Sequence, residues 1–313
     1  IDNPEIKNSK ASFYDLILKY NHQISKKTSL ESTIYYSKDL FNLTSDSTYT
    51  YSNRILALNG KHNFEEKKLE VEWKISPTIS SMNDPDIRMT RYQYKGNGYD
   101  IGAESGFPTR IWREMQEYNL SGVLHFTQKL QIKERDAKFK YGGAYTYKER
   151  DFNIQLYNIN LNNTLNRSGL LTGDPNELFS ANNLWTTNDR PGFSPNINSL
   201  QTIYSQDFSP LNTNQFNANN TYIAGYTSIE MEYFKNLKSV IGLRVEKFTQ
   251  RYTGRDQNGS NILNNTKVLD DFDLFPTVNL VYAVNDTQNI RLSYSKTIAR
   301  PSFKELSFAE IID

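Results

Sequence analysis

The side chains best suited to bind a ligand are aromatic residues and arginines in two long segments that lack a regular hydrophobic period. Aromatic faces bind sugars, catechols and haem-like rings, and the arginine fork holds carboxylate or phosphate groups. The candidates are Tyr92, Tyr94, Tyr99, Phe107, Arg110 and Trp112 in the first segment, and Trp185, Arg190 and Phe193 in the second. Packing of one loop on another is the alternative role for each of them, and it stays open.

No group of residues has the spacing of a catalytic or metal site. His22, His62 and His125 lie far apart in the chain, and neither GxSxG nor HExxH occurs. Cysteine is absent, which removes thiol catalysis, disulfides and thiolate metal ligands. Gly96–Gly102 has its third glycine one residue late for a dinucleotide loop. We therefore predict no enzyme activity, no catalytic residue, no bound metal and no cofactor.

Two groups of aspartates could hold a hard cation through their oxygens. They are Asp84 with Asp86, and Asp270 and Asp271 with Asp273. Neither group has the spacing of an EF-hand loop. We interpret both as solvated loop charge.

The segments that carry the candidate ligand-binding residues are connected by predicted strands, each with one apolar face. Apolar residues occupy every second position from Phe272 to Val284, and the same period returns at Ile290, Leu292 and Tyr294 after a short turn. This pattern predicts an antiparallel hairpin with one apolar face. Similar alternation recurs through about ten strands. The residues that we predict to face lipid are Leu120, Leu124, Ile241, Leu243, Leu280 and Leu292.

The connections between these strands alternate between short and long. Long loops are predicted near residues 78–115, 158–219 and 252–271. Outer-membrane barrels have short periplasmic turns and long extracellular loops, whereas a soluble sandwich has no reason to sort its loops by end. The pattern therefore favours a barrel.

Composition favours the same class. The chain has 21 Tyr and 17 Phe at a mean hydropathy of -0.68, which suits a barrel whose aromatics form girdles while its lumen stays polar. No run of about 18 apolar residues occurs, so any membrane crossing must be by strands. A net charge of +1 gives no basic excess for nucleic acid.

One stretch carries a specific resemblance. Residues 290–306 read IRLSYSKTIARPSFKEL, which follows the pattern LRxSYSxTxxRPxFxEL at every fixed position but the first, where Ile290 stands. Residues 275–282 read FPTVNLVY. These segments resemble the barrel of Bacteroidota-like TonB-dependent outer-membrane receptors. The resemblance implies a barrel of about 22 strands, plugged by an N-terminal domain, in the outer membrane of a Gram-negative bacterium. It also implies import of a scarce ligand, such as an iron chelate, haem, cobalamin or a glycan, with energy delivered by a TonB-type protein.

We expect residues 1–313 to be part of one antiparallel, all-β transmembrane barrel domain, with further strands on both sides and both ends of the chain outside the cell. The plug domain and the TonB-contacting segment are expected to lie outside this chain. Outer-membrane lipid is an expected partner, a surface lipoprotein stays open as another, and nucleic acid is not expected. Arg300-Pro301 is assigned a structural role, because proline ends strand pairing.

Two alternatives remain at this point. The first is a secreted, soluble β-sandwich that acts as an adhesin or a carbohydrate-binding module, in which the apolar strand faces would meet each other. The second is an enzyme built on an outer-membrane barrel, if several carboxylates and serines converge in space. The loops follow no readable code, so every ligand class named above stays open.

Overall fold

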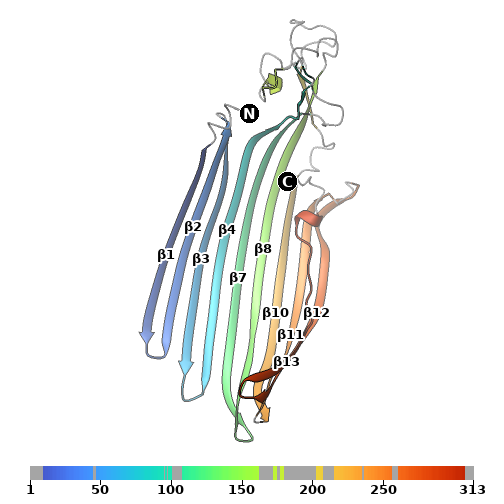
Figure 1. The fold of residues 1–313 in the computed structure, drawn as a ribbon. Coiled ribbons are helices and arrows are strands. Elements are labelled where there is room, and N and C mark those ends of the chain that lie inside the picture. The colour runs from blue at the N-terminus through green and yellow to red at the C-terminus, as the bar shows by residue number, and fades with distance from the viewer. Residues whose placement is uncertain are drawn as a thin grey trace.

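The protein forms one long, curved antiparallel sheet (Figure 1). The computed structural model describes residues 10–44, 47–94, 96, 98–100, 108–161, 172–174, 177–179, 202–206, 215–234, 236–255 and 260–306. Ten strands pair in the order in which they follow one another along the chain, and β9 (Thr202–Gln206) pairs with β8 beyond this path. The ten are β1 (Lys10–Ser25), β2 (Thr28–Thr44), β3 (Ser47–Phe64), β4 (Leu69–Met89), β7 (Thr109–Ile132), β8 (Arg135–Leu161), β10 (Gln215–Phe234), β11 (Leu237–Arg255), β12 (Ile262–Asn285) and β13 (Gln288–Ser295).

The all-β class and the number of about ten main strands are confirmed. A small separate pair, β5 (Gln93–Tyr94) and β6 (Tyr99–Asp100), lies in the connection between β4 and β7. Two short 3-10 helices occur at Glu177–Phe179 and Lys304–Leu306. Among the described residues, no helix is long and apolar enough to cross a membrane.

The strands are longer than their apolar alternation indicates, so the predicted loop boundaries were wrong. β4 continues to Met89 and β7 begins at Thr109, inside the loop predicted near residues 78–115. The segments near 158–219 and 252–271 likewise begin and end inside strands. A bilayer needs only about 9 to 11 residues of a tilted strand, whereas β7 has 24 and β8 has 27. Backbone pairing therefore continues well past the first apolar alternation, and in β8 apolar residues then return on the opposite face, at Phe152, Ile154 and Leu156.

The connections sort by end, as the sequence predicts. Residues 26–27, 65–68, 133–134, 235–236 and 286–287 join consecutive strands at one end of the sheet, here called the turn end. The connections from β4 to β7 and from β8 to β10 leave the opposite end, here called the loop end (Figure 1). At the loop end the bounds of β2 and β3 leave only residues 45–46 between them, and those of β11 and β12 leave only residues 256–261, so the sorting has exceptions.

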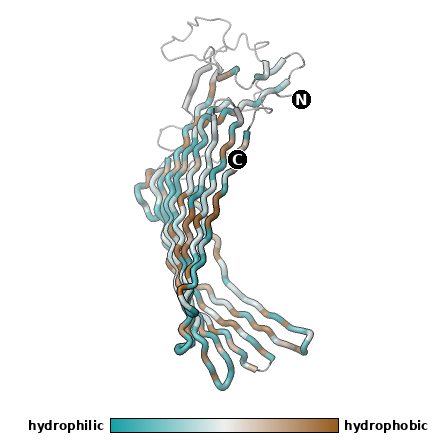
Figure 2. The backbone as a smooth tube through the Cα atoms, turned by 90° about the vertical axis from the view of Figure 1, so that its left-hand side faces the viewer, coloured by the Kyte–Doolittle hydropathy of each residue, from teal (hydrophilic) through white to brown (hydrophobic). Residues whose placement is uncertain are grey.

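One face of the sheet carries the alternating apolar residues and is here called the belt face. The strand register brings all six predicted lipid-facing residues to it. Leu120, Leu124, Ile241, Leu243 and Leu292 are exposed by 40–64%, and Leu280 is partly buried beside Leu292. Figure 2 shows hydrophobic residues recurring between hydrophilic ones along the strands. That lipid covers this face stays a prediction.

The opposite face is here called the strap face, because residues 296–306, the strap, fold back over it. Towards the turn end it carries polar pairs. Lys61 Nζ lies 2.9 Å from Glu72 Oε1, and Lys140 Nζ donates to Glu230 Oε2 at 3.2 Å. The turn-end half of the sheet is therefore apolar on the belt face and polar on the strap face.

The polarity of the two faces is reversed towards the loop end. There the strap face holds the main hydrophobic core, formed by Ile111, Phe152, Ile154, Leu156, Phe216, Ala218, Tyr252 and Phe303. On the belt face, at the same level, polar Gln116 pairs in register with Asp151, and Asp151 pairs with Asn217. The loop-end half is thus built for water on the belt face and for packing on the strap face.

Glycine is required where aromatic rings lie flat on the sheet. On the strap face a Cβ at Gly142 would overlap the backbone oxygen of Leu124 and lie 2.8 Å from the ring of Tyr226. Tyr226 is held there by a 2.8 Å hydrogen bond with His125 Nδ1.

We expect Gly142→Ala to destabilise the sheet by about 1–3 kcal/mol, because the backbone atom cannot move aside. The control is Gly122→Ala, since a Cβ at Gly122 meets one atom, at 3.8 Å. Urea unfolding in detergent, followed by tryptophan fluorescence, measures both variants. Equal midpoints for the two variants would contradict this account of the glycine.

Candidate functional site

Three of the predicted ligand-binding aromatics pack together at the loop end. The Tyr94 ring lies 5.4 Å from the Tyr99 ring, and Tyr92 meets Tyr99 edge-on at 6.1 Å. Tyr99 also covers Gly173, where a Cβ would come within 2.8 Å of the ring. The Tyr92 hydroxyl donates to the backbone oxygen of Asp174 at 2.9 Å. These aromatics therefore join the connection after β4 to the connection after β8.

The same contacts perturb Tyr92. Burial, and then the neighbouring Glu177 carboxylate, raise the pKa of the Tyr92 phenol above its ordinary value. Glu177 in turn accepts hydrogen bonds from the backbone N–H and the hydroxyl of Thr172, at 2.8 and 2.9 Å. The phenol stays a neutral hydrogen-bond donor, which suits a packing role.

Aspartates of the first cluster are paired with arginines instead of being solvated, which corrects the prediction. Asp84 and Asp86 lie in β4, where the register with β7 shifts at a β-bulge between Asp84 and Ile87. Asp84 is fully buried, with Arg113 Nη2 2.8 Å from its Oδ2. Asp86 Oδ2 lies 2.6 Å from Arg88 Nη2 and 2.8 Å from Arg110 Nη2. No group of three or more metal-ligating side chains occurs in the described part of the chain.

Two of the three aspartates in the second cluster, Asp270 and Asp273, are also paired. Asp270 lies 2.5 Å from Lys247 Nζ and 2.8 Å from Lys267 Nζ, and Asp273 lies 3.1 Å from Arg300 Nη2. With these lysines and this arginine as neighbours, the carboxylates have no need of a cation.

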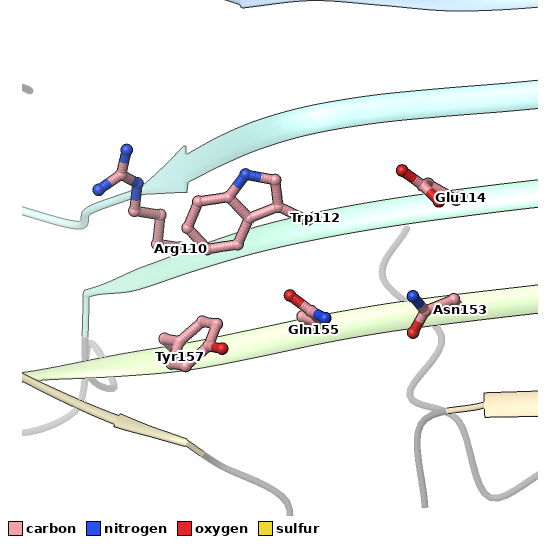
Figure 3. Close-up of a pocket in the computed structure, with 6 residues that line it drawn as sticks. All are labelled: Arg110, Trp112, Glu114, Asn153, Gln155 and Tyr157. Atoms are coloured by element: carbon pink, nitrogen blue, oxygen red, sulfur yellow. The ribbon is translucent and has the colours of Figure 1, made fainter. Parts of the chain in front are cut away.

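A recess of about 440 Å³ opens on the belt face between β7 and β8, close to the loop end (Figure 3). It is lined by Arg110, Trp112, Glu114, Asn153, Gln155 and Tyr157. The register explains this grouping, because Arg110 pairs with Tyr157, Trp112 with Gln155, and Glu114 with Asn153.

Aromatic and cationic contacts fix the wall of the recess. The Arg110 guanidinium lies over the Trp112 ring at 5.0 Å, and the Tyr157 ring meets Trp112 edge-on at 5.6 Å. Asp86 holds Arg110 from the other side. The recess therefore offers a fixed aromatic wall beside two amides and a carboxylate.

The recess continues into a second hollow of about 890 Å³, with which it shares Glu114 and Asn153. The two hollows together are here called the trough. Asn217 Nδ2 donates to Asp151 Oδ1 at 2.7 Å in this part of the belt face. The lining of the trough thus combines amides and carboxylates with apolar side chains, among them the core residues Phe152 and Phe216, and it has Trp112 and Tyr157 at one end.

A third constellation lies on the strap face. Arg300 of the strap donates to Glu246 Oε2 and Asp273 Oδ2, each at 3.1 Å, and lies over the Phe248 ring at 4.8 Å. Three residues later, Phe303 is buried in the hydrophobic core beneath Arg150. The predicted structural role of Arg300-Pro301 thus takes the form of an anchor for the strap.

Comparisons with known proteins bear on the fold. Residues 193–310 match the outer membrane protein beta-barrel family. The sheet is a section of the wall of an outer-membrane β-barrel. The wall lies in the outer membrane of a Gram-negative bacterium. No curated protein is similar enough in sequence to match the chain.

Solved structures show the same barrel architecture. The siderophore receptor PiuA from Acinetobacter baumannii is 13% identical with a TM-score of 0.59, and the match covers 92% of this chain and 42% of PiuA. The ferripyoverdine receptor of Pseudomonas aeruginosa is 17% identical with a TM-score of 0.56, covering 92% and 35%. The copper transporter OprC is 11% identical with a TM-score of 0.59, covering 96% and 38%. The chain thus spans well under half the length of these barrel proteins.

The barrel wall brings together some predicted site residues and separates others. Arg110 and Trp112 lie on wall strand β7 and line the recess, not in a loop as predicted. The cluster of Tyr92, Tyr94 and Tyr99 is separate from that recess in the described contacts. Four further predicted residues, Phe107, Trp185, Arg190 and Phe193, lie outside the described residues.

Four residues of the recess were missed by sequence reasoning. Asn153, Gln155 and Tyr157 alternate with apolar Phe152, Ile154 and Leu156, but in the opposite phase to the belt, and Glu114 lies in a less regular stretch. This reversed alternation indicates that the strand continues, and extending the hairpin of β7 and β8 through it would have placed Tyr157 opposite Arg110.

We expect Tyr99→Ala to loosen the contact between the two connections at the loop end of the barrel. The ring contacts Tyr92, Tyr94 and Gly173, and its removal leaves a cavity with few neighbours to fill it. Hydrogen exchange at residues 172–174 should become at least about tenfold faster, a change of roughly 1.4 kcal/mol in local opening. Unchanged exchange there would show that the tyrosine cluster does not hold these connections together.

Proposed function

We propose that this chain is part of the wall of a TonB-dependent receptor, which captures a scarce ligand outside the cell and imports it with TonB-supplied energy. The observation that carries the proposal is the reversal of polarity along the sheet. An apolar belt about as tall as a bilayer is followed by wall that is polar on the belt face and packed on the strap face. A barrel that only crossed the membrane would have no need for this second half.

In this proposal the loop end lies outside the cell and the turn end lies in the periplasm. The strap face becomes the wall of the lumen, where water can solvate the polar pairs. Lipid contacts the six belt residues on the other face. Strands β1 and β13 are the two ends of the described strand order and each pairs with one described neighbour, so further strands are proposed to continue the barrel from these edges. A plug domain and a segment that contacts a TonB-type protein would complete the receptor. The proposal also allows a surface lipoprotein as a partner and a Bacteroidota-like source of the protein.

We assign ligand capture to the loop end. We assign no bond-making or bond-breaking chemistry to it. The described residues there are aromatic, amide and arginine side chains in paired or packed positions, which bind but do not activate a substrate. An iron chelate, haem, cobalamin or a glycan is the expected class of cargo. We infer that the protein is not an enzyme.

The structure contradicts the soluble sandwich. In that fold the apolar faces would meet, but in the described residues one sheet forms and its belt-face leucines stay exposed. An enzyme on a barrel gains no support, because the described contacts do not bring a serine to a histidine and a carboxylate.

The test is energy-dependent uptake by cells that carry the intact protein. Cells with and without the protein are supplied in turn with an iron chelate, haem, cobalamin and oligosaccharides, and accumulation is followed with and without an uncoupler. We expect one class to accumulate only when the protein is present and the inner membrane is energised. Accumulation that persists in uncoupled cells would contradict the TonB mechanism, and equal accumulation without the protein would contradict the receptor.

A further inference from the structure

We propose that the trough on the belt face binds the saccharide chain of an outer-leaflet glycolipid. This inference concerns the outside of the wall and not the imported cargo, so it goes beyond the proposed function. It rests on the place of the trough, on its lining and on its charge.

The place of the trough separates it from any path through the barrel. Trp112 lies on the same face as Tyr118 and Leu120, six and eight residues further along β7, and both of these are exposed on the apolar belt. At about 3.3 Å per residue, the recess lies roughly 20 Å beyond the edge of the belt. A glycolipid held in the leaflet beside the wall would carry its sugars to this height. Cargo in the lumen would meet the strap face instead.

The lining suits sugar rings. Aromatic rings pack against the apolar C–H faces of a pyranose, and amide and carboxylate groups each accept or donate to neighbouring hydroxyls. Trp112 and Tyr157 supply two rings at one end, and Glu114, Asn153 and Gln155 follow along the strands (Figure 3). In the second hollow Gln116, Asp151 and Asn217 extend this row of polar groups, beside apolar core residues such as Phe152. The two hollows together have room for more than one sugar ring, which suits a chain of sugars.

The charge of the trough selects hydroxyls over anionic groups. Arg110 is the cation among the described residues of the recess, and Asp86 already pairs with it. Glu114 and Asp151 leave the described lining acidic. A phosphate or carboxylate would be repelled there, so we assign the trough to the neutral sugars of the chain.

The experiment measures glycolipid binding to the intact protein in detergent micelles by native mass spectrometry. Glycolipid extracted from the outer membrane is used whole, and a second portion is split by mild acid into its lipid part and its free saccharide. We expect the whole glycolipid to bind more tightly than either part. Trp112→Ala should weaken binding of the whole glycolipid by about tenfold or more, since a large ring contact is lost. It should leave binding of the lipid part unchanged.

A milder variant and a matched control guard against misfolding. Gln155→Ala removes one exposed amide from the recess and should weaken binding by a few-fold, or roughly 1 kcal/mol. Tyr94→Ala removes an exposed ring outside the trough and should leave glycolipid binding unchanged.

Three results would overturn the proposal. Unchanged binding of whole glycolipid in both trough variants would exclude the trough. Equal binding of the free saccharide and the whole glycolipid would assign it to a soluble glycan. Equal binding of the lipid part and the whole glycolipid would show that the sugars make no contact. None of these results involves uptake, so failure here leaves the proposed receptor function standing, and failure of uptake leaves this site standing.

Discussion

Arg300→Ala is expected to cost the wall about 3 kcal/mol of stability. Its guanidinium joins Glu246 and Asp273 and lies over Phe248, and all three charged side chains are exposed by less than a fifth. Removing one partner from a mostly buried ion pair leaves carboxylates that are neither solvated nor paired, which typically costs 3–5 kcal/mol. Arg244 still pairs with Glu246, so we expect the lower end of that range.

Denaturant unfolding of the refolded protein in lipid vesicles measures this effect. Arg300→Lys keeps the charge but not the fork and should recover part of the loss. In a background with Asp273→Asn, the Arg300→Ala change should cost less, because one of the two stranded carboxylates is gone. If Arg300→Ala costs under about 0.5 kcal/mol, the ion pairs of Arg300 behave like exposed surface pairs, which contribute little to stability. The strap would then not be anchored there.

Leu124→Arg is expected to have the second large effect. Leu124 is 40% exposed on the belt face. It lies four residues further along β7 than Leu120, and so deeper in the belt. An arginine that faces lipid near the middle of a bilayer costs about 2–4 kcal/mol in barrels, and less near the interfaces. Folding yield into vesicles and the unfolding midpoint should both fall.

The matched control is the neighbouring residue. Val123→Arg places the same side chain on the strap face, where the register sets Val123 between Lys74 and Ala144. In the lumen this arginine would reach water, so we expect a loss of under about 1 kcal/mol. Equal losses at positions 123 and 124 would mean that the two faces do not differ in their solvent.

The turn-end half of the fold could be predicted from the sequence because lipid imposes a rule on it. Every second residue must be apolar there, so Leu120, Leu124 and Leu243 reveal strand, face and register together. The same rule predicted the short turns between strands. The boundaries of β4 and β7 were missed because their loop-end halves lie outside the belt, where hydropathy no longer has to alternate.

The candidate site was harder to predict because it depends on pairing between distant residues. Arg110 and Trp112 were singled out for their chemistry, but they were placed in a loop. Gln155 and Tyr157 follow a local alternation with Ile154 and Leu156, but they join Trp112 and Arg110 only through the register of a hairpin more than 40 residues long. Asp86 was interpreted as solvated because one of its two partners, Arg110, lies 24 residues away in sequence, and the other, Arg88, reaches it across a β-bulge that the sequence does not reveal.

The most direct test of the barrel account is to measure whether lipid or water surrounds alternate residues along the strands of the wall. The chain contains no cysteine, so single Leu120→Cys, Leu124→Cys, Ile241→Cys, Leu243→Cys, Leu280→Cys and Leu292→Cys variants can each carry one fluorescent probe. Strap-face probes at Val123, Ala144 and Val240 serve as controls. The account predicts that brominated lipids quench the six belt probes and leave the three controls bright. Equal quenching on both faces, or none on the belt face, would contradict it.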